Sequence, residues 1–308
     1  MSELNELISR MFPFHKYTCN VVISTSSFIG EGEHKIFDYI RNQCNCTTCN
    51  IVYGLDADLF MLSLANLQYN NNIYLYRETP HFIKTIDSSL DPNKSYLIDI
   101  PELAKIINEN LNNKSNIDRT LDYVFLCFLL GNDFLPHFPA LNIRTNGIEY
   151  IMNAYKSVIG NNTIISNNCI QWRFMHKIIS KLSENENDYI NKEYFIRGKQ
   201  EHNVINNKSE PSDINDTIMN LPITERQIEH YINPNERDWE SRYYIKLFDM
   251  NPCDVRIKEI CTNYLEGLEW VLNYYTIDCK DWRWSYKYCC SGGHFKKWSN
   301  GNITIWQR

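Results

Sequence analysis

The 308-residue chain lacks any run of 18 apolar residues, and it has no N-terminal segment in which positive charge precedes an apolar stretch. It therefore shows the signature of neither a membrane span nor a secretory signal. Positive charge is also not in excess, because 31 Lys and Arg residues against 37 Asp and Glu residues give a formal net charge of −6. A nucleic-acid-binding protein of this balance has to concentrate its cations locally.

Glycine and proline are scarce, with 11 and 10 residues, whereas asparagine is abundant in two stretches. The first, "IGNNTIISNN" at 159–168, predicts a polar turn or loop. The second, at 197–216, is polar enough to predict a flexible insert or linker.

Eleven cysteines without a signal segment indicate a soluble chain in a reducing compartment, the cytoplasm or the nucleus, with mostly free thiols. One tight cluster is present, Cys44, Cys46 and Cys49 in "NQCNCTTCN". These three residues could begin a zinc site, but no fourth ligand follows at a familiar spacing. Zinc binding by this cluster stays open.

Strand and helix patterns alternate through the first half of the chain. Short β-branched or aromatic runs predict strands at 20–24, 50–55 and 73–78. A helix is predicted after each of the first two strands. The helix after the strand at 20–24 has Ile36, Phe37 and Ile40 on one face. This alternation predicts an α/β fold with a mostly parallel sheet that helices flank on both faces. Functional groups are then expected at the carboxyl ends of the strands.

Two further helices complete this pattern. "LIDIPELAKIINENL" predicts a strand end that leads into a helix near Pro101, and "IDRTLDYVFLCFLLG" predicts an apolar helix that ends at Gly131.

Acidic residues gather at the boundaries of these predicted elements. Glu31 and Glu33 lie on a Gly-flanked turn just before a helix, and Asp56 and Asp58 lie where a strand gives way to a helix. Asp133 follows the end of the apolar helix. Each acid alone has an ordinary structural explanation: a helix cap, a turn residue, or, for Glu31, an i,i+4 pairing with Lys35. Their shared placement at three junctions favours a common function.

A divalent cation would explain why acids are held so close together. Two like charges about 4 Å apart repel by about 4 kcal/mol at an effective dielectric constant of 20, so a close pair favours a bound cation. Carboxylate oxygens without imidazole or thiolate neighbours favour Mg²⁺ or Mn²⁺ over zinc. Two such ions about 4 Å apart activate water and stabilise the leaving oxygen in phosphodiester hydrolysis.

The C-terminal part combines aromatic and basic residues. "WESRYYIKLF" and "KDWRWSYKY" place rings beside five cations, Arg242, Lys246, Lys280, Arg283 and Lys287. This mixture is typical of surfaces where bases stack on rings and phosphates contact cations. Between these stretches, Tyr264, Leu268 and Leu272 keep helical spacing, which predicts core packing instead.

Four segments carry a resemblance to a known family: "GEGEHKI", "YGLDADL", "FLCFLLGNDFLPHFPAL" and "YLEGLEWVLNYYTIDCKDWRWSYKY". In residue identity, order and spacing they resemble motifs of the Xrn family of 5′→3′ exoribonucleases, which are relatives of the flap endonucleases and have a PIN-like core. The resemblance covers about 20–160 and 236–290. It implies a PIN-like nuclease core at 1–160, a variable helical insert at 161–235, and a helical segment at 236–308 that packs on the core.

The resemblance also implies a site and a substrate. It identifies five acids as metal-binding and catalytic: Glu31, Glu33, Asp56, Asp58 and Asp133. The implied substrate is single-stranded RNA with a 5′ monophosphate, degraded to mononucleotides with Mg²⁺ or Mn²⁺. One of Trp282 and Trp284 is expected to stack on a terminal base, and the expected RNA-contacting cations are Arg283, Lys35 and Arg41.

One departure from the family pattern leaves alternatives open. Family members carry two more metal-binding aspartates and a basic phosphate pocket before "GEGEHK", whereas only 30 residues precede Glu31 here and "MSELNELISRMFPFHKY" contains no Asp. A second polypeptide could supply the missing half, or the chain is a degenerate copy or a fragment. Two other functions also stay open: an inactive RNA-binding or scaffold protein of this fold, and a DNA-directed 5′ flap nuclease.

Overall fold

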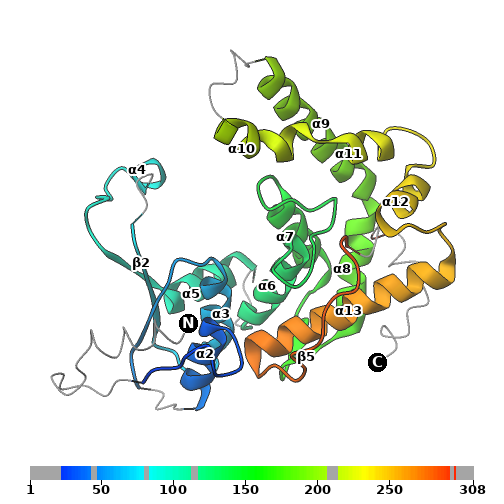
Figure 1. Cartoon of the computed structure of the whole chain (residues 1–308). Coiled ribbons are helices and arrows are strands. Elements are labelled where there is room, and N and C mark those ends of the chain that lie inside the picture. The colour runs from blue at the N-terminus through cyan, green and yellow to red at the C-terminus, as the bar shows by residue number, and fades with distance from the viewer. Residues whose placement is uncertain are drawn as a thin grey trace. The chain divides into compact units, whose positions relative to one another are not determined.

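The computed structural model describes residues 22–42, 47–79, 83–111, 117–206, 214–291 and 295 (Figure 1). The chain divides into two compact units. Unit 1 comprises Met1–Leu103 together with Tyr275–Asp278, and unit 2 comprises Ala104–Tyr274 together with Cys279–Arg308. Unit 1 therefore contains a short segment from near the other end of the sequence.

Unit 1 contains a small mixed sheet. Its strands are β1 (Asn50–Tyr53), β2 (Ile73–Arg77) and β3 (Tyr96–Asp99), in the order β1-β2-β3. β1 pairs with β2 in parallel, and β2 pairs with β3 in antiparallel fashion. Alternation along the strands buries Val52, Ile73 and Leu75 on one face. The fold is thus mixed α/β, as predicted, and the described sheet is small, with one parallel and one antiparallel pairing, so the mostly parallel sheet stays a prediction.

The prediction of a strand at 20–24 was wrong for the residues that the structure describes. Residues 22–24 form no strand, and residues 20–21 lie outside the described ranges. The strands predicted at 50–55 and 73–78 are confirmed as β1 and β2, each slightly shorter than expected.

Three of the four described helices of unit 1 follow the predicted positions, and the short helix α4 was not predicted. The four are α2 (Gly32–Asn42), α3 (Asp58–Asn66), α4 (Ile83–Ile86) and α5 (Ile100–Leu111), of which the last continues into unit 2. In α2 the buried side chains are His34, Phe37 and Ile40, spaced three apart. Ile36, predicted on that face, is 41% exposed, so a histidine takes the place that periodicity assigned to isoleucine.

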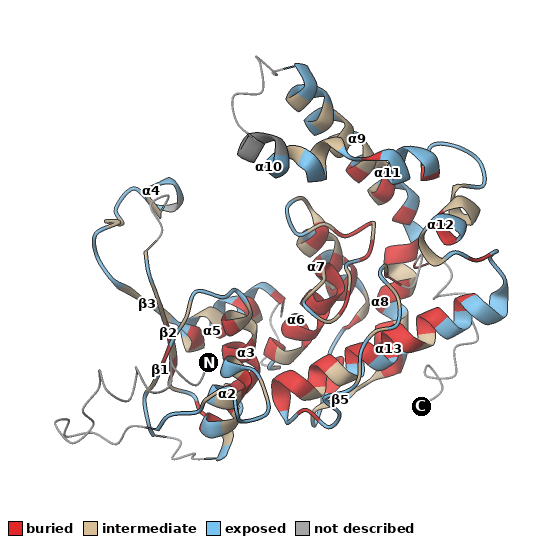
Figure 2. Ribbon diagram, viewed as in Figure 1, coloured by how far each residue is buried: buried red, intermediate tan, exposed pale blue. Residues whose placement is uncertain are grey.

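Unit 2 is mostly helical among its described residues. The elements are α6 (Thr120–Cys127), the 3₁₀ turn η2 (Phe128–Leu130), α7 (Gly147–Val158), β4 (Ile165–Ser166), β5 (Cys169–Ile170), α8 (Trp172–Glu184), α9 (Glu186–Asn206), α10 (Ile214–Thr224), α11 (Gln227–Ile232), α12 (Trp239–Phe248) and α13 (Asp254–Thr276), whose last two residues belong to unit 1. Figure 2 shows α13 lined with buried positions along much of its length. Tyr264, Leu268 and Leu272 are among them, which confirms their predicted core role.

The apolar helix ends where the sequence predicted. α6 passes through η2 into Gly131, whose φ of +93° is one that residues with a side chain rarely adopt. The Gly131 N–H donates to the Phe128 carbonyl at 3.2 Å and closes the last turn. The chain then leaves the helix directly into the segment that carries Asp133.

The two Asn-rich stretches have different structures. Asn167 and Asn168 both have positive φ, 50° and 57°, and form the two-residue turn between β4 and β5, as the prediction of a turn requires. The prediction of a flexible insert at 197–216 was wrong for the residues described, because 197–206 belong to α9 and 214–216 to α10. Residues 207–213 lie outside the described part of the chain.

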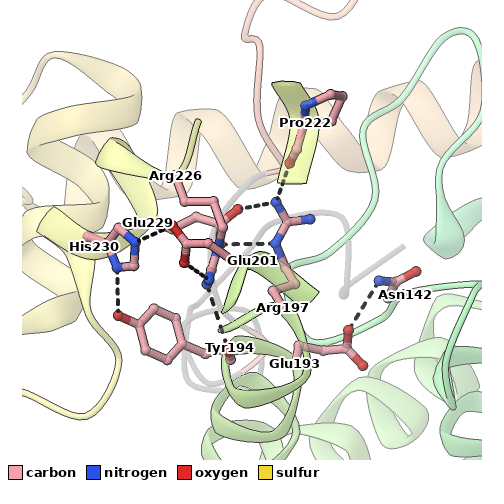
Figure 3. A network of polar contacts seen from close by, with 9 residues as sticks. All are labelled: Asn142, Glu193, Tyr194, Arg197, Glu201, Pro222, Arg226, Glu229 and His230. Atoms are coloured by element: carbon pink, nitrogen blue, oxygen red, sulfur yellow. Dashed lines mark hydrogen bonds and ion pairs between the residues drawn. The ribbon is translucent and has the colours of Figure 1, made fainter. Parts of the chain in front are cut away.

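Ion pairs and hydrogen bonds link the polar helices α9, α10 and α11 (Figure 3). The Arg226 side chain is only 1% exposed and donates to Glu201 of α9 and to Glu229 of α11, each at 2.7 Å. Arg197 donates to Glu229 and to the Pro222 carbonyl of α10. Charged side chains therefore take part in packing these helices, beside the buried apolar residues that usually identify a packed helix.

No helix in the described ranges is long and apolar enough to cross a membrane.

Candidate active site

The first acid pair lies at the start of α2. Gly30, with a φ of +103°, turns the chain into this helix, and the Glu31 carbonyl accepts the first helical hydrogen bond from the Lys35 N–H at 3.1 Å. Lys35 Nζ donates to the Thr25 carbonyl at 3.0 Å and so holds the preceding loop. The Glu31 side chain is exposed and that of Glu33 is half-buried.

The electrostatics of Glu33 indicate a crowded acidic site. Partial burial raises the pKa of the Glu33 carboxyl, and the negative charges of Glu31 and Asp56 raise this pKa further. Asp56 is far from Glu33 in sequence, so the fold has brought acids from two junctions into mutual influence. A bound cation would relieve this repulsion.

The second acid pair follows β1. The Gly54 N–H donates to the Tyr76 carbonyl at 3.2 Å, which extends the pairing with β2 up to the point where Asp56 begins the turn. Asp56 Oδ1 accepts the backbone N–H of Asp58 at 3.3 Å, so Asp56 also stabilises the start of helix α3. Asp58 is the first residue of α3 and is half-buried.

Asp133 belongs to unit 2 and lies in the turn after Gly131. The neighbouring Asn132 builds this turn, because its Oδ1 accepts the N–H groups of Phe134 and Leu135, each at 2.9 Å. Asp133 itself is exposed. The turn thus depends on the amide of Asn132, and the carboxylate of Asp133 is not required for it.

The donor set fits a hard divalent cation by its chemistry. Four carboxylates of unit 1 lie at two junctions, and three of them interact electrostatically. Mg²⁺ and Mn²⁺ prefer such oxygen ligands. Among the described residues, however, no three His, Cys, Asp or Glu side chains converge closely enough to hold a metal ion.

The zinc alternative can be placed only in part. Cys49 is exposed and carries a free thiol. Cys44 and Cys46 lie outside the described residues, so zinc binding by this cluster remains untested.

The two tryptophans of the C-terminal segment have different environments in unit 2. The Trp284 ring stacks on Trp270, with centroids 5.2 Å apart and planes 22° apart, and it lies 2.7 Å from where a Cβ on Gly267 would be. Trp282 is 43% exposed and meets Tyr274 edge-on at 6.1 Å. Trp284 is therefore part of a packed aromatic cluster, whereas Trp282 presents ring surface to solvent.

The predicted RNA-contacting cations also differ. Arg283 is exposed, and Lys35 is half-buried and bonded to the loop before α2. The Arg41 side chain is only 6% exposed, and its Nη1 donates to Asn66 Oδ1 at 3.1 Å. Burial lowers the pKa of the Arg41 guanidinium. Arg242, a cation of the aromatic segments, donates to carbonyl groups at the end of α11, including that of Ile232 at 2.8 Å.

Sequence reasoning missed three polar residues of unit 1. His34 is buried, and its Nε2 lies 3.3 Å from Asp278 Oδ1. Burial and the charge of Arg41 lower the pKa of His34, and the Asp278 contact opposes them. Asn66 is fully buried at the end of α3. The position of His34 on a buried helix face offered a signal, but nothing in the sequence linked it to a residue 244 positions away.

These features define a mixed α/β protein, mostly helical, with acids gathered where a strand and a turn meet helices. The model of the Xrn1 helical domain matches residues 114–230 and 215–292, which together are more than half of the chain, and the model of the XRN 5′-3′ exonuclease N-terminus matches residues 2–79. The chain belongs to the Xrn family of 5′→3′ exoribonucleases.

Two curated relatives are similar over most of the chain, and a third is more similar over a shorter part of it. A 5′-3′ exoribonuclease 2 of Gallus gallus is 26% identical over 87% of this chain and 39% of its own length. The 5′-3′ exoribonuclease 2 homolog of Drosophila melanogaster is 25% identical over 92% of this chain and 40% of its own length. A 5′-3′ exoribonuclease 2 of Yarrowia lipolytica is 36% identical over 44% of this chain and 15% of its own length. The chain thus spans about two fifths of the first two relatives.

Proposed function

We propose that this chain is a 5′→3′ exoribonuclease, or the metal-binding part of one, that acts on single-stranded RNA with a 5′ monophosphate. Membership of the Xrn family and the names of its relatives support the reaction class. The observation that carries the site is the meeting of acids from two junctions at Glu33, whose carboxyl pKa is raised first by burial and then by the charges of Glu31 and Asp56. Such crowding of acids is typical of a site built for cations.

The proposed site divides the roles among the chain's own residues. Glu31, Glu33, Asp56 and Asp58 of unit 1 supply carboxylate ligands for Mg²⁺ or Mn²⁺. The metal-binding role of Asp133, in unit 2, stays a prediction. When bound, the cations supply Lewis-acid activation of water and stabilise the leaving oxygen of the phosphodiester. Trp282 supplies exposed ring surface for a base, and exposed Arg283 supplies a cation for a phosphate.

Matched oligonucleotides test the reaction. Single-stranded RNA and DNA of one sequence, each with a 5′ monophosphate or a 5′ hydroxyl, are incubated with the purified chain and Mn²⁺, and products are resolved by length. We expect mononucleotides from the 5′-phosphorylated RNA alone. Equal cleavage of the DNA would favour the flap-nuclease alternative, and binding without cleavage would favour the inactive scaffold. Robust cleavage by the chain alone would also show that a second polypeptide is not required for activity.

A further inference from the structure

A short segment from near the other end of the sequence completes unit 1. Residues Tyr275–Asp278, here called the brace, belong to this unit although their neighbours on both sides belong to unit 2. The Tyr275 carbonyl accepts from Asn66 Nδ2 at 3.0 Å, and the Thr276 carbonyl accepts from the Tyr69 hydroxyl at 2.8 Å. The brace is therefore bonded to the end of α3 and the turn that follows it.

Asn66 is the centre of these contacts. Its side chain is fully buried, and its Nδ2 donates to the Leu62 carbonyl of α3 at 2.8 Å as well as to the brace. Its Oδ1 accepts from Arg41 Nη1 at the end of α2. One carboxamide thus joins α2, α3 and the brace. Both of its donors and its acceptor are used, and among the standard side chains of this length only asparagine offers that set.

The helices joined by Asn66 are the two at whose starts the acid pairs lie. Glu33 lies in the first turn of α2 and Asp58 in the first turn of α3, while Arg41 and Asn66 lie in the last turns. The brace also reaches the first turn of α2, because Asp278 Oδ1 lies 3.3 Å from His34 Nε2, next to Glu33. Helix α2 is therefore held at both ends, and α3 is held at the end away from its acids.

A small rotation at this junction would move the acids by more than a metal site tolerates. A helix of nine residues is about 13 Å long, so a tilt of about 10° moves its far end by about 2 Å. Functional constellations must be held within about 0.5 Å. The contacts at the far ends of α2 and α3 are consequently suited to set the separation of the carboxylates.

We propose that Asn66 is a positioning residue for the metal site of unit 1, acting together with the brace. This inference rests on the proposed function, because it assumes that Glu31, Glu33, Asp56 and Asp58 bind a cation. Asn66 does not touch the cation. It acts through the relative placement of α2 and α3.

The test compares two buried asparagines of unit 1. Asn66→Asp keeps an acceptor for Arg41 and removes both donated bonds. Asn70 is 2% exposed, and its Nδ2 donates to the Thr48 carbonyl at 3.0 Å. This hydrogen bond involves neither α2 nor the brace, so Asn70→Asp is the matched control. Mn²⁺ binding to the full chain is measured by titration calorimetry, and stability by thermal melting.

We expect both variants to melt at similarly lowered temperatures, but only Asn66→Asp to lose Mn²⁺ affinity, by about tenfold or more. Equal Mn²⁺ affinity in the two variants would overturn the positioning role. If Asn66→Asp does not fold, Asp278→Asn replaces it, because that side chain is largely exposed and the change weakens the contact of the brace with His34. Unchanged affinity in that variant would equally overturn the inference. Absence of saturable Mn²⁺ binding by the parent chain would overturn the proposed function together with it, which distinguishes the two failures.

Discussion

At the scale of single residues, the acids at the β1–α3 junction combine a structural and a proposed catalytic role. Asp56 accepts the Asp58 N–H, yet its charge also raises the pKa of Glu33. Asparagine retains an Oδ1 acceptor but carries no charge. An Asp-to-Asn change at this junction therefore removes the proposed chemistry and leaves the local hydrogen bond available.

We expect the double change Asp56→Asn and Asp58→Asn to abolish Mn²⁺-dependent cleavage of 5′-phosphorylated RNA. The melting temperature should stay the same or rise, because two like charges leave a repulsive cluster. Cleavage assays and thermal melts provide the measurement. Asp99→Asn is the control, since Asp99 also stands at a strand-to-helix junction but accepts the Glu102 N–H at the start of α5. A double variant that cleaves at the parent rate would refute the assignment.

The two tryptophans provide a second comparison at this scale. We expect Trp282→Ala to weaken binding of short single-stranded RNA by about 1–3 kcal/mol without changing the melting temperature. Trp284→Ala should instead destabilise the fold by about 3 kcal/mol, because its ring packs between Trp270 and Gly267. Fluorescence anisotropy and melts at one salt concentration separate the two effects. A normal RNA affinity in Trp282→Ala would remove this ring from the binding surface.

At the scale of elements, apolar periodicity was informative only where apolar side chains do the packing. It located β1, β2 and α13, since each has a repeated apolar pattern. The glycine at the end of η2 was located by residue type, because its backbone angle favours glycine. Periodicity failed for α9, where Arg197 pairs with Glu229 and Glu201 pairs with Arg226. It also failed at Ile36, because a histidine with a remote acceptor took the buried position.

The α9–α11 network should make stability depend on acid pH. Hydrogen bonding from His230 and then the charge of Arg226 lower the pKa of Glu201 below its usual value of 4.5. The unfolded state therefore binds this proton more readily than the folded state does. The stabilisation is present above about pH 4.5 and is lost as the pH falls through the lower folded pKa.

We expect Glu201→Gln to lower stability near pH 7 by about 1.5–3 kcal/mol, because the buried guanidinium of Arg226 loses a charged acceptor. The difference from the parent chain should shrink as the pH falls below about 4.5, where the parent loses the same stabilisation. Denaturant unfolding from pH 3.5 to 7 measures this. A difference that stays constant with pH would show that the charge of Glu201 is not responsible.

At the scale of the whole molecule, a bound cation should stabilise the chain. A ligand that binds only the folded state at 100 times its Kd adds about 2.7 kcal/mol. We therefore expect Mn²⁺ to raise the melting temperature of the parent chain, and the Asp56→Asn and Asp58→Asn double variant to show no such rise. Excess chelator should reverse the effect. An equal rise in both proteins would indicate binding elsewhere.

The placement of the five acids at element boundaries could be predicted from the sequence, and their metal-binding role stays a prediction. The residues that hold those elements together could not be predicted. Asn66 and Tyr275 are 209 positions apart, and neither stands out by type, charge or spacing. The division of the chain at 1–160, 161–235 and 236–308 stays a prediction.

The brace has a consequence for the order in which the protein forms during synthesis. Its contacts with His34, Asn66 and Tyr69 span 244, 209 and 207 residues, so they can form only after the ribosome has released the end of α13. Contacts of such high sequence separation slow folding. Helices α2 and α3 therefore lack their contacts with the brace until the chain has been translated as far as that segment. An early stop in translation before residue 275 would leave a nascent chain whose acid-bearing helices lack their final partner.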